Sequence, residues 1–425
     1  MLRRIFSPIM VNNRLFIKEQ HQGHDYMIPT TPKKLTPPDL SKATAFKFVI
    51  LLGCVSLFAD MTYEGARSIT GPYLAILGAN AMTVGFVAGF GEFIGYGLRL
   101  VSGYLADRTG RYWAITIAGY VCNLVAVPLL ALAGHWWIAA TLMVIERMGK
   151  AMRVPSRDAM LSHAGQKMGM GWVFGLHEAL DQVGAMIGPL IVAAVLYSKD
   201  SYQFSFAILG IPAILALSIL LFARWLYPNP QSLEKPSENL ESKGITRAFW
   251  LYLISASLIA AGYADFPLIA YHFQKTAVLS PIWIPVSYSI AMGVNILSAP
   301  LLGRFYDRNG FSILIIVTIL SCLFAPLVFF GNFSLCLIGI ILWSIGVGAH
   351  ESLMRAIVAN MIPIKKRGSA YGIFNMGFGL SWFLGSFLMG ALYDISIPML
   401  VAFSVGIQLV AVPMMWLVMR KIKYQ

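Results

Sequence analysis

Charged residues are scarce in this sequence. Asp, Glu, Lys and Arg make up 12% of its 425 positions, hydrophobic residues make up 58%, and the mean hydropathy is +0.70. A water-soluble domain carries about 25% charged residues. The composition therefore excludes a soluble globular protein and indicates a chain that crosses a membrane many times, since about twelve spans of about 20 residues fit into this length.

Cysteine and the motifs of enzymes are scarce or missing as well. No Cys-x-x-Cys pair occurs, so we expect neither disulfides nor thiolate metal sites at the cysteines, which all lie in apolar runs: Cys54, Cys122, Cys322 and Cys336. There is no glycine-rich phosphate loop, catalytic triad or metalloprotease motif. The sequence thus predicts no enzymatic activity, no cofactor, no metal and no use of ATP.

The net charge of +13 is explained by where the bases lie. If the N-terminus is inside, the outer loops hold only Lys199 and Lys275, whereas nearly all other bases lie in the N-terminal tail, the opposite loops, the linker and the C-terminal residues 420–423. This is the positive-inside pattern. It predicts an integral protein of the inner (cell) membrane with both termini in the cytoplasm, and no nucleic-acid partner.

Two sets of six apolar segments can be recognised. The first set covers 46–77, 82–106, 112–133, 136–153, 171–197 and 205–227, and the second covers 249–274, 283–303, 312–330, 333–350, 369–393 and 397–419. The polar tail lacks the apolar core of a signal peptide, and its His21–Asp25 run HQGHD is a weak metal motif. We therefore predict an all-α membrane protein with a cytoplasmic tail (1–44), a six-helix bundle (45–227), a cytoplasmic linker (228–246) and a second six-helix bundle (247–425).

Two internal repeats indicate that the halves are related. The stretch GYLADRTGRYW from Gly103 and the stretch GRFYDRNG from Gly303 share Gly, Asp, Arg and Gly at a shift of 200. Glycines shared by the fifth and eleventh segments, such as Gly188 and Gly385 at a shift of 197, suggest close approach between helices.

The first repeat resembles the loop signature G-x-x-x-D-R-x-G-R-[RK] of the major facilitator superfamily of secondary transporters. It departs from the signature at Tyr112, and the second copy departs at Phe311. The resemblance implies twelve helices in two pseudo-symmetric bundles, and a gating role for Gly103, Asp107, Arg108, Gly110, Arg111, Gly303, Asp307, Arg308 and Gly310. We expect Asp107 at the N-terminal edge of the third helix, facing free N–H groups, and Arg108 and Arg111 paired with acids or lipid phosphate.

Ionisable residues within the segments point to a polar interior. Each costs about 2.5–3.5 kcal/mol at the bilayer centre and is usually paired or functional. The third, sixth, ninth and twelfth segments lack charges within their spans, apart from Arg224 near the end of the sixth, and should face lipid. The resembled superfamily implies the same division, since its cavity is lined by the first, second, fourth and fifth helices of each half. The candidate substrate or proton residues are Asp60, Glu64 and Arg67 on one helix face, Glu92 and Arg99 on another, and Glu178, Asp181 and Asp265.

Several roles stay open for these residues. Glu64 and Arg67 could neutralise one another, but Asp60 would remain. We expect that at least one of Asp60, Glu64, Glu92 and Asp181 exchanges a proton, because burial favours the neutral form of a carboxylate. Arg67 and Arg99 either favour the charged form of these carboxylates or hold an anionic part of the substrate. Glu178 and Asp181 beside His177 contact substrate, protons or only another helix, and one His is a weak sign of metal.

The inner end of the fourth segment carries a cluster made of Arg147, Lys150, Arg153, Arg157 and Asp158. Its bases could be positive-inside anchors, or the cluster could act in gating with Asp158 paired to a base or capping a helix. The run GAMIGP (Gly184–Pro189) is similar to part of the antiporter signature of drug-exporting members and favours export slightly.

The sequence therefore predicts a secondary transporter that works by alternating access, is coupled to protons and exports a small solute. The expected partners are that solute, protons and the lipid bilayer, for a monomeric protein. The carboxylates suit an organic cation, a zwitterion or an amphipathic compound, and the arginines keep anions open. Uptake of an organic or metal-chelate solute and a membrane sensor that binds without transport are the alternatives.

Overall fold

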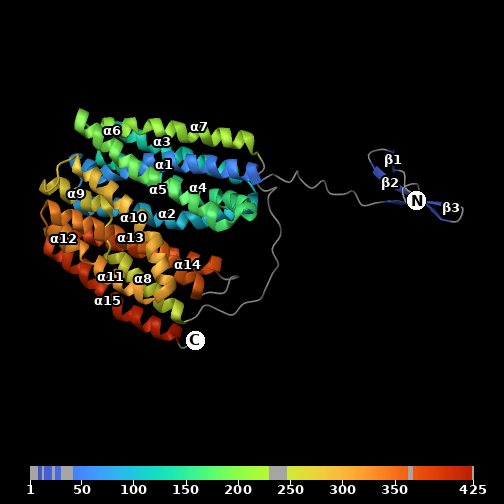
Figure 1. Cartoon of the computed structure of the whole chain (residues 1–425). Coiled ribbons are helices and arrows are strands. Elements are labelled where there is room, and N and C mark those ends of the chain that lie inside the picture. Colours follow the sequence, from blue (N-terminus) through green and yellow to red (C-terminus); the bar gives the residue numbers. More distant parts are fainter. Residues whose placement is uncertain are drawn as a thin grey trace. The chain divides into compact units, whose positions relative to one another are not determined.

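A computed structural model describes residues 8–11, 14–21, 24–29, 42–228, 247–361 and 367–423, which fall into two compact units, Met1–Ser41 and Lys42–Gln425 (Figure 1). The first unit contains strands β1 (Pro8–Val11), β2 (Arg14–His21) and β3 (His24–Pro29), paired antiparallel in that order. The sequence analysis placed no strand in this tail, although residues that favour strands, such as Val11, Phe16 and Ile17, occur in it. The predicted linker lies almost wholly outside the described residues.

The second unit is helical, and its first half supplies six membrane crossings. They are α1 (Lys42–Ile76), α2 (Ala81–Thr109), α3 (Tyr112–Leu129) with the short 3₁₀ helix η1 (Leu130–Leu132), α4 (Trp136–Met168), α5 (Met170–Lys199), and α6 (Tyr202–Ile208) followed by α7 (Gly210–Leu226).

The second half repeats this plan in a second bundle (Figure 1). Its crossings are α8 (Arg247–Gly262) with α9 (Phe266–Thr276), α10 (Trp283–Asn309), α11 (Ser312–Ser321) with α12 (Phe324–Phe330), α13 (Phe333–Met361), α14 (Arg367–Ile395) and α15 (Ile397–Lys423). We call the end that holds the turns at 77–80, 200–201 and 396 the outer end, after the orientation predicted from the charges.

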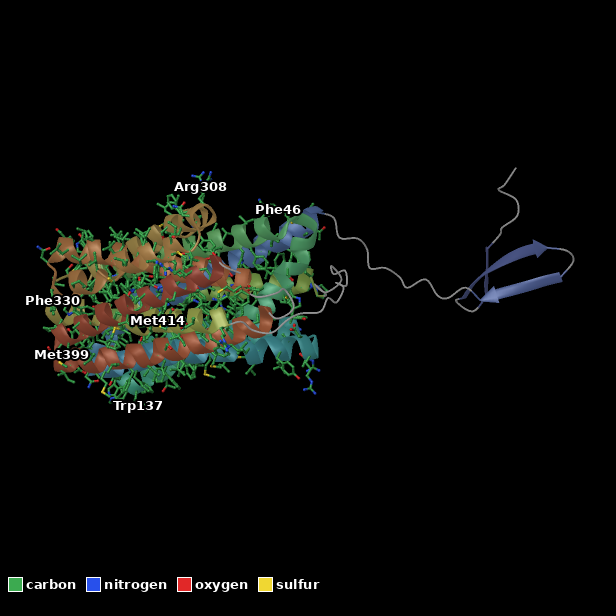
Figure 2. The ribbon with its side chains drawn as sticks, turned by 90° about the horizontal axis from the view of Figure 1, so that it is seen from below. Phe46, Trp137, Arg308, Phe330, Met399 and Met414 are labelled. Carbon is green, nitrogen blue, oxygen red and sulfur yellow. The ribbon has the colours of Figure 1, made fainter. Side chains whose placement is uncertain are left out.

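Eleven helical segments among the described residues are long and apolar enough to cross a membrane. The remaining crossing is α4, whose apolar stretch is interrupted by Glu146, Arg147, Lys150 and Arg153. Large apolar side chains cover the outside of the unit, and of those labelled in Figure 2, Trp137 and Phe330 are both 57% exposed. An aqueous surface would not favour this many exposed apolar groups, whereas lipid does. The predicted all-α membrane fold is confirmed.

Close packing of glycines joins the helices within each half. A Cβ at Gly188 of α5 would overlap the Met61 carbonyl of α1, and a Cβ at Gly385 of α14 would overlap the Ala261 carbonyl of α8. These two glycines occupy matching places in the repeat, so the predicted close approach is present in both halves. Gly175, by contrast, has no atom within 4 Å of its Cβ position.

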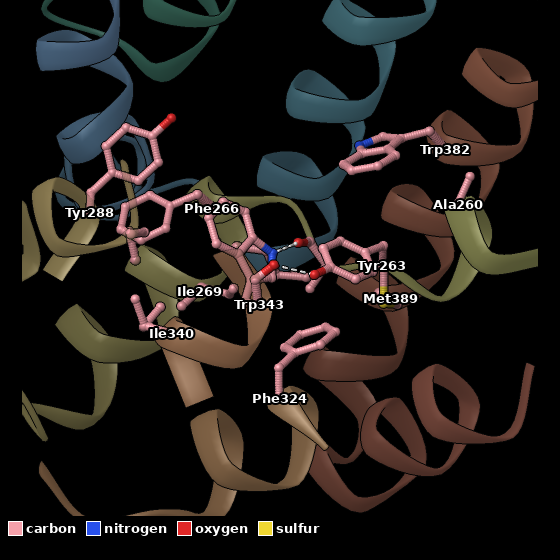
Figure 3. Close-up of a cluster of buried hydrophobic side chains, with 14 of the residues drawn as sticks. Ala260, Tyr263, Phe266, Ile269, Tyr288, Phe324, Ile340, Trp343, Trp382 and Met389 are labelled. Atoms are coloured by element: carbon pink, nitrogen blue, oxygen red, sulfur yellow. Dashed lines mark hydrogen bonds between the residues drawn. The ribbon is translucent and has the colours of Figure 1, made fainter. Parts of the chain in front are cut away.

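The seventh crossing is broken between α8 and α9, where the sequence predicted one continuous segment. Gly262 and Ala264 lie at the break, and their carbonyls accept hydrogen bonds from Ser404, Gln408 and Trp343. Figure 3 shows the Trp343 indole and the Tyr263 ring beside the break, with Tyr263 donating to the Trp343 carbonyl. The backbone groups freed by the break are thus satisfied by protein, as an apolar environment requires. The next helix, α9, starts with Asp265 as its N-cap.

Candidate functional site

The polar centre of the first half is built on α4. Arg147, Lys150, Arg153 and Arg157 follow one another at nearly one-turn spacing, which places them on one side of the helix. Arg153 is only 1% exposed, and the side chain of Lys150 is 22% exposed. These bases therefore lie inside the bundle, and not at its lipid-facing surface as membrane anchors would.

Each of these four bases faces a carboxylate from another helix. The closest nitrogen-to-oxygen distances are 3.5 Å for Arg153–Asp60, 3.6 Å for Lys150–Glu64, 3.6 Å for Arg147–Glu92 and 3.7 Å for Arg157–Asp181. The four acids come from α1, α2 and α5. They are the same four that the sequence marked as candidates for proton exchange, and the structure brings all of them to one helix.

Arg67 connects this centre to the second half. Its Nη2 lies 2.7 Å from Asp265 Oδ1 and 3.2 Å from Glu92 Oε1. The break before α9 fixes the position of Asp265, because the same carboxylate oxygen also accepts from the Phe266 N–H that begins α9. The alternative in which Arg67 only neutralises Glu64 does not describe this geometry, since Arg67 bridges acids of both halves.

A second contact between the halves involves Glu64. Its Oε2 accepts a hydrogen bond of 2.5 Å from the Tyr288 hydroxyl of α10, while its other oxygen faces Lys150. Glu64 is therefore shared between a base of its own half and a hydroxyl of the other. Such charge-assisted bonds are stronger than neutral ones, so Glu64 and Arg67 together hold α1 against α9 and α10.

A small pocket that is partly open to the surface lies beside Arg67. Arg67, Arg147, Glu146 and Asp265 form its polar side. Apolar residues of α1, α2, α3, η1 and α4 form the rest, among them Leu74, Val84, Val87, Val127, Leu130 and Met143. The third segment was expected to face lipid only. One face of α3 exposes Val121 and Val125, whereas the opposite face packs on α4 and contributes Val127 to this pocket. The absence of charge therefore did not mean that the whole helix faces lipid.

A smaller polar cluster lies toward the inner end, among α1, α3, α4 and α5. His177 Nε2 lies 3.2 Å from Ser56 Oγ and 3.6 Å from Asp181 Oδ2, and Arg157 donates to the same serine at 3.0 Å. Arg157 also pairs with Asp158 at 2.9 Å. Asp158 thus pairs with a base of the cluster, which was one of its two expected roles.

Two further predicted residues contact neighbours on their own helices. Glu178 is exposed and accepts from Gln182 at 3.1 Å. Arg99 lies over the ring of Tyr96 on its own helix, 5.3 Å from the ring centre. Among the side chains that the structure describes, no group of three His, Cys, Asp or Glu residues is arranged to hold a metal ion.

The loop motif differs from the expectation at Asp107. This residue lies in the last turn of α2, where its carboxylate accepts from the Tyr112 hydroxyl at 3.0 Å, and not at the N-terminal edge of α3 as predicted. Arg108 donates to Tyr104 at 3.3 Å. The predicted place of Asp107 was wrong because α2 continues to Thr109, and Gly110, with φ of 65°, then ends it.

The second copy of the motif is described only in part. Gly310 has φ of 63° at the end of α10, and Arg308 is exposed at the surface (Figure 2). The side chain of Asp307 lies outside the described residues. The two departures from the signature lie at the start of the helix that follows. Tyr112 is the first residue of α3, and Phe311 is the N-cap residue of α11.

Gly103 and Gly303 provide a matched test of the motif. A Cβ at Gly103 would lie 3.4 Å from Pro155 Cβ of α4, whereas no atom lies within 4 Å of the same position at Gly303. We expect Gly103→Leu to slow transport by about tenfold, because overpacking costs about 1–3 kcal/mol, and to leave membrane insertion unchanged. Gly303→Leu is the control. Equal flux in both variants, measured in proteoliposomes, would contradict a role for this contact.

The sequence profile of the Major Facilitator Superfamily matches residues 52–386 and 311–424. The chain belongs to the major facilitator superfamily. An uncharacterised protein of Mycobacterium tuberculosis is 44% identical to this superfamily member over 388 residues, which cover 90% of this chain and 94% of the relative. The multidrug resistance protein MdtH of Photorhabdus laumondii subsp. laumondii is 24% identical over 344 residues, covering 78% and 84%.

A solved structure shares the fold of this superfamily member. The crystal structure of a mutant of the nucleoside transporter NupG superposes with a TM-score of 0.72 at 14% identity, covering 86% of this chain and 99% of that one. At this identity the likeness concerns the fold alone. Membership in the superfamily establishes an integral membrane transporter of small molecules, and not an enzyme.

The sequence missed several residues of the polar centre. One is Tyr288, and another is Tyr120 of α3, whose ring lies under the Arg153 guanidinium at 4.4 Å and whose hydroxyl is 3.3 Å from Ser56 Oγ. Both lie in apolar runs, where a tyrosine is usually part of the core, and no spacing distinguishes them. Glu146 could have been found, because it is an acid within a predicted span. In the structure it pairs with Arg147 at 3.3 Å and accepts from Asn123 at 2.7 Å.

Proposed function

We propose that this protein is a proton-coupled secondary transporter that exports a small amphipathic solute by alternating access. The observation that carries the proposal is the set of four carboxylates, Asp60, Glu64, Glu92 and Asp181, that each face a base of α4. Burying so many charges costs free energy unless they are paired. Because the four bases belong to one helix, a movement of α4 can separate an acid from its base and let the acid bind a proton.

The paired acids support coupling to a cation. Asp60, Glu64, Glu92 and Asp181 each face a base of α4. A buried carboxylate that loses its base favours uptake of a proton or of a cationic group. A cationic or zwitterionic solute and protons can therefore compete for the same acids.

The two contacts between the halves suggest how binding is linked to movement. When the halves rock apart at the outer end, Asp265 loses Arg67 and Glu64 loses Tyr288. Both carboxylates then lack a partner in a poorly hydrated region, so a proton or a substrate cation binds more tightly in that state. Such a difference in affinity is what a ligand needs to shift a conformational equilibrium.

Export of an amphipathic solute is supported by two further features. The pocket beside Arg67 combines an apolar wall with a polar side, and the run Gly184–Pro189 is similar to part of an antiporter signature. The relative MdtH is named a multidrug resistance protein. We also propose that both termini lie in the cytoplasm, because the outer loops carry only Lys199 and Lys275.

The proposal is tested with amide variants in proteoliposomes. We expect at least one of Asp60→Asn, Glu64→Gln, Glu92→Gln and Asp181→Asn to lower proton-driven flux by tenfold or more, about the effect of losing 1.4 kcal/mol of differential binding. Flux is followed with a pH-sensitive dye inside the vesicles, using ethidium as a cation, dialanine as a zwitterion and uridine as a neutral solute.

The controls separate the remaining alternatives. Glu178→Gln removes an exposed carboxylate of the same region and should leave flux unchanged. Undiminished flux in all four amide variants would end the proton proposal. If a probe binds but shows no counterflow into preloaded vesicles, the protein is a sensor, and if the pH gradient drives accumulation in the direction of proton entry, it is a symporter.

A further inference from the structure

The last turn of α14 reaches across to the other half of the molecule. Asp394 accepts two backbone hydrogen bonds from the start of α2, with its Oδ1 3.2 Å from the Ala81 nitrogen and its Oδ2 2.9 Å from the Met82 nitrogen. The next N–H, that of Thr83, is satisfied by the N-cap Asn80 at 2.9 Å. Two of the free donors at the start of α2 are therefore satisfied by a carboxylate that belongs to the second half.

This contact suits the chemistry of a helix N-terminus. The first N–H groups of a helix have no acceptor within the helix, and the aligned peptide dipoles place partial positive charge at this end, which a carboxylate stabilises. The interaction is a bond between the two halves, because the free donors are on one half and their acceptor is on the other.

The duplicated half lacks this arrangement. In the repeat, α10 corresponds to α2, and its N-cap residue Ile282 makes no side-chain cap hydrogen bond. The shift of 197 that relates α5 to α14 places Tyr197 opposite Asp394, and Tyr197 is 80% exposed. A contact needed only to build the fold should occur in both halves. Its presence on one side indicates a task that the second side does not share.

The backbones of α2 and α14 touch around this contact. A Cβ at Gly390 would overlap the Ala81 carbonyl, and a Cβ at Gly85 would overlap the Ser386 carbonyl. One turn further inward, the Phe86 ring packs edge-on against Phe383, with 5.6 Å between ring centres. The outer ends of the two halves are thus closed against one another, and Asp394 sits at the rim of this closed seam.

We infer that Asp394 is the latch of the outer end: its two hydrogen bonds to α2 hold the halves closed there, and they must break each time the transporter opens outward. The inference rests on the alternating access of the proposed function. Removing the latch favours the outer-open state. Asp394→Asn keeps one acceptor oxygen and removes the charge, whereas Asp394→Ala removes both, so the shift grows from the first variant to the second.

The experiment measures the opening directly. Spin labels at Trp137→Cys and Met399→Cys report the distance between the halves at the outer end, since both side chains are exposed there, one on α4 and one on α15 (Figure 2). The four native cysteines are first replaced. We expect the population of the longer distance to increase by about tenfold in Asp394→Ala, the ratio that follows from losing a carboxylate cap, and by less in Asp394→Asn.

The control is Asp200→Asn, the same substitution at the outer end of α5, where the exposed residue has φ of 47° and asparagine is equally tolerated. Identical distance distributions in wild type, Asp394→Asn and Asp394→Ala would overturn the latch. A shift in distance with no flux of any probe would keep the latch and reject the proposed transport. Normal flux with unshifted distances would reject the latch alone. Because Asp394→Asn is isosteric, it remains informative if Asp394→Ala does not fold.

Discussion

Replacing Arg67 by methionine is expected to lower the free energy of unfolding by about 3–5 kcal/mol, the cost of leaving buried charges without a partner, and to abolish transport. Arg67 is the cation between Asp265, which is 2% exposed, and Glu92, whose side chain is 19% exposed. Methionine has a similar length, so the effect reports lost charge more than lost volume. Thermal unfolding in detergent and flux in proteoliposomes measure the two outcomes.

Two further variants separate the ion pair from general damage. Adding Asp265→Asn to Arg67→Met removes one of the orphaned charges and should restore part of the stability without restoring flux. Arg224→Met makes the same change at an exposed arginine of α7 and should alter neither. An Arg67→Met protein as stable as the wild type would show that the pair between the halves does not stabilise their contact.

Adding a single methyl group at Gly71 is expected to stop transport. A Cβ there would overlap the Pro267 carbonyl oxygen and lie 2.9 Å from the Tyr271 nitrogen, so Gly71→Ala forces α1 away from α9. Gly71 is one turn from Arg67, and the same displacement stretches the 2.7 Å contact to Asp265. We expect a loss of about 1–3 kcal/mol in stability from overpacking and a fall in flux of more than tenfold.

The matched control is Gly95→Ala in the interior of α2, where no atom lies within 4 Å of the Cβ position. Alanine should be neutral there or stabilise the helix by up to about 1 kcal/mol. If Gly71→Ala and Gly95→Ala have the same melting temperature and flux, then α1 and α9 do not need to touch at the outer end during the cycle.

The sequence predicted which residues are polar inside the membrane better than it predicted their partners. Asp60, Glu64 and Arg67 share a helix face because of their spacing, and this could be read directly. That Asp60 meets Arg153 while Glu64 meets Lys150 depends on how α1 and α4 are rotated against one another, which periodicity does not determine. The pairing of Arg67 with Asp265 links residues almost 200 positions apart and required the three-dimensional structure.

The break in the seventh crossing shows a local signal that could have been used. Asp265 followed by Phe266 and Pro267 has the pattern of an N-cap with proline in the first turn, yet the surrounding apolar run predicted a continuous helix. The contact made by Asp394 had no such signal, because an acid at the end of a predicted span is usually a solvated residue. Its acceptor role becomes visible only when the start of α2 is placed beside it.

The charges of α4 also constrain how the protein is made. Each base near the bilayer centre opposes insertion of a single helix by about 2.5–3.5 kcal/mol, and the fourth crossing carries Arg147, Lys150 and Arg153 beside the acid Glu146. The ribosome completes α1 and α2 before α4, so Asp60, Glu64 and Glu92 are already in the membrane when the bases leave the translocon. We therefore expect insertion of α4 to depend on helices made earlier. Loss of these acids should first cause α4 to insert incorrectly during synthesis.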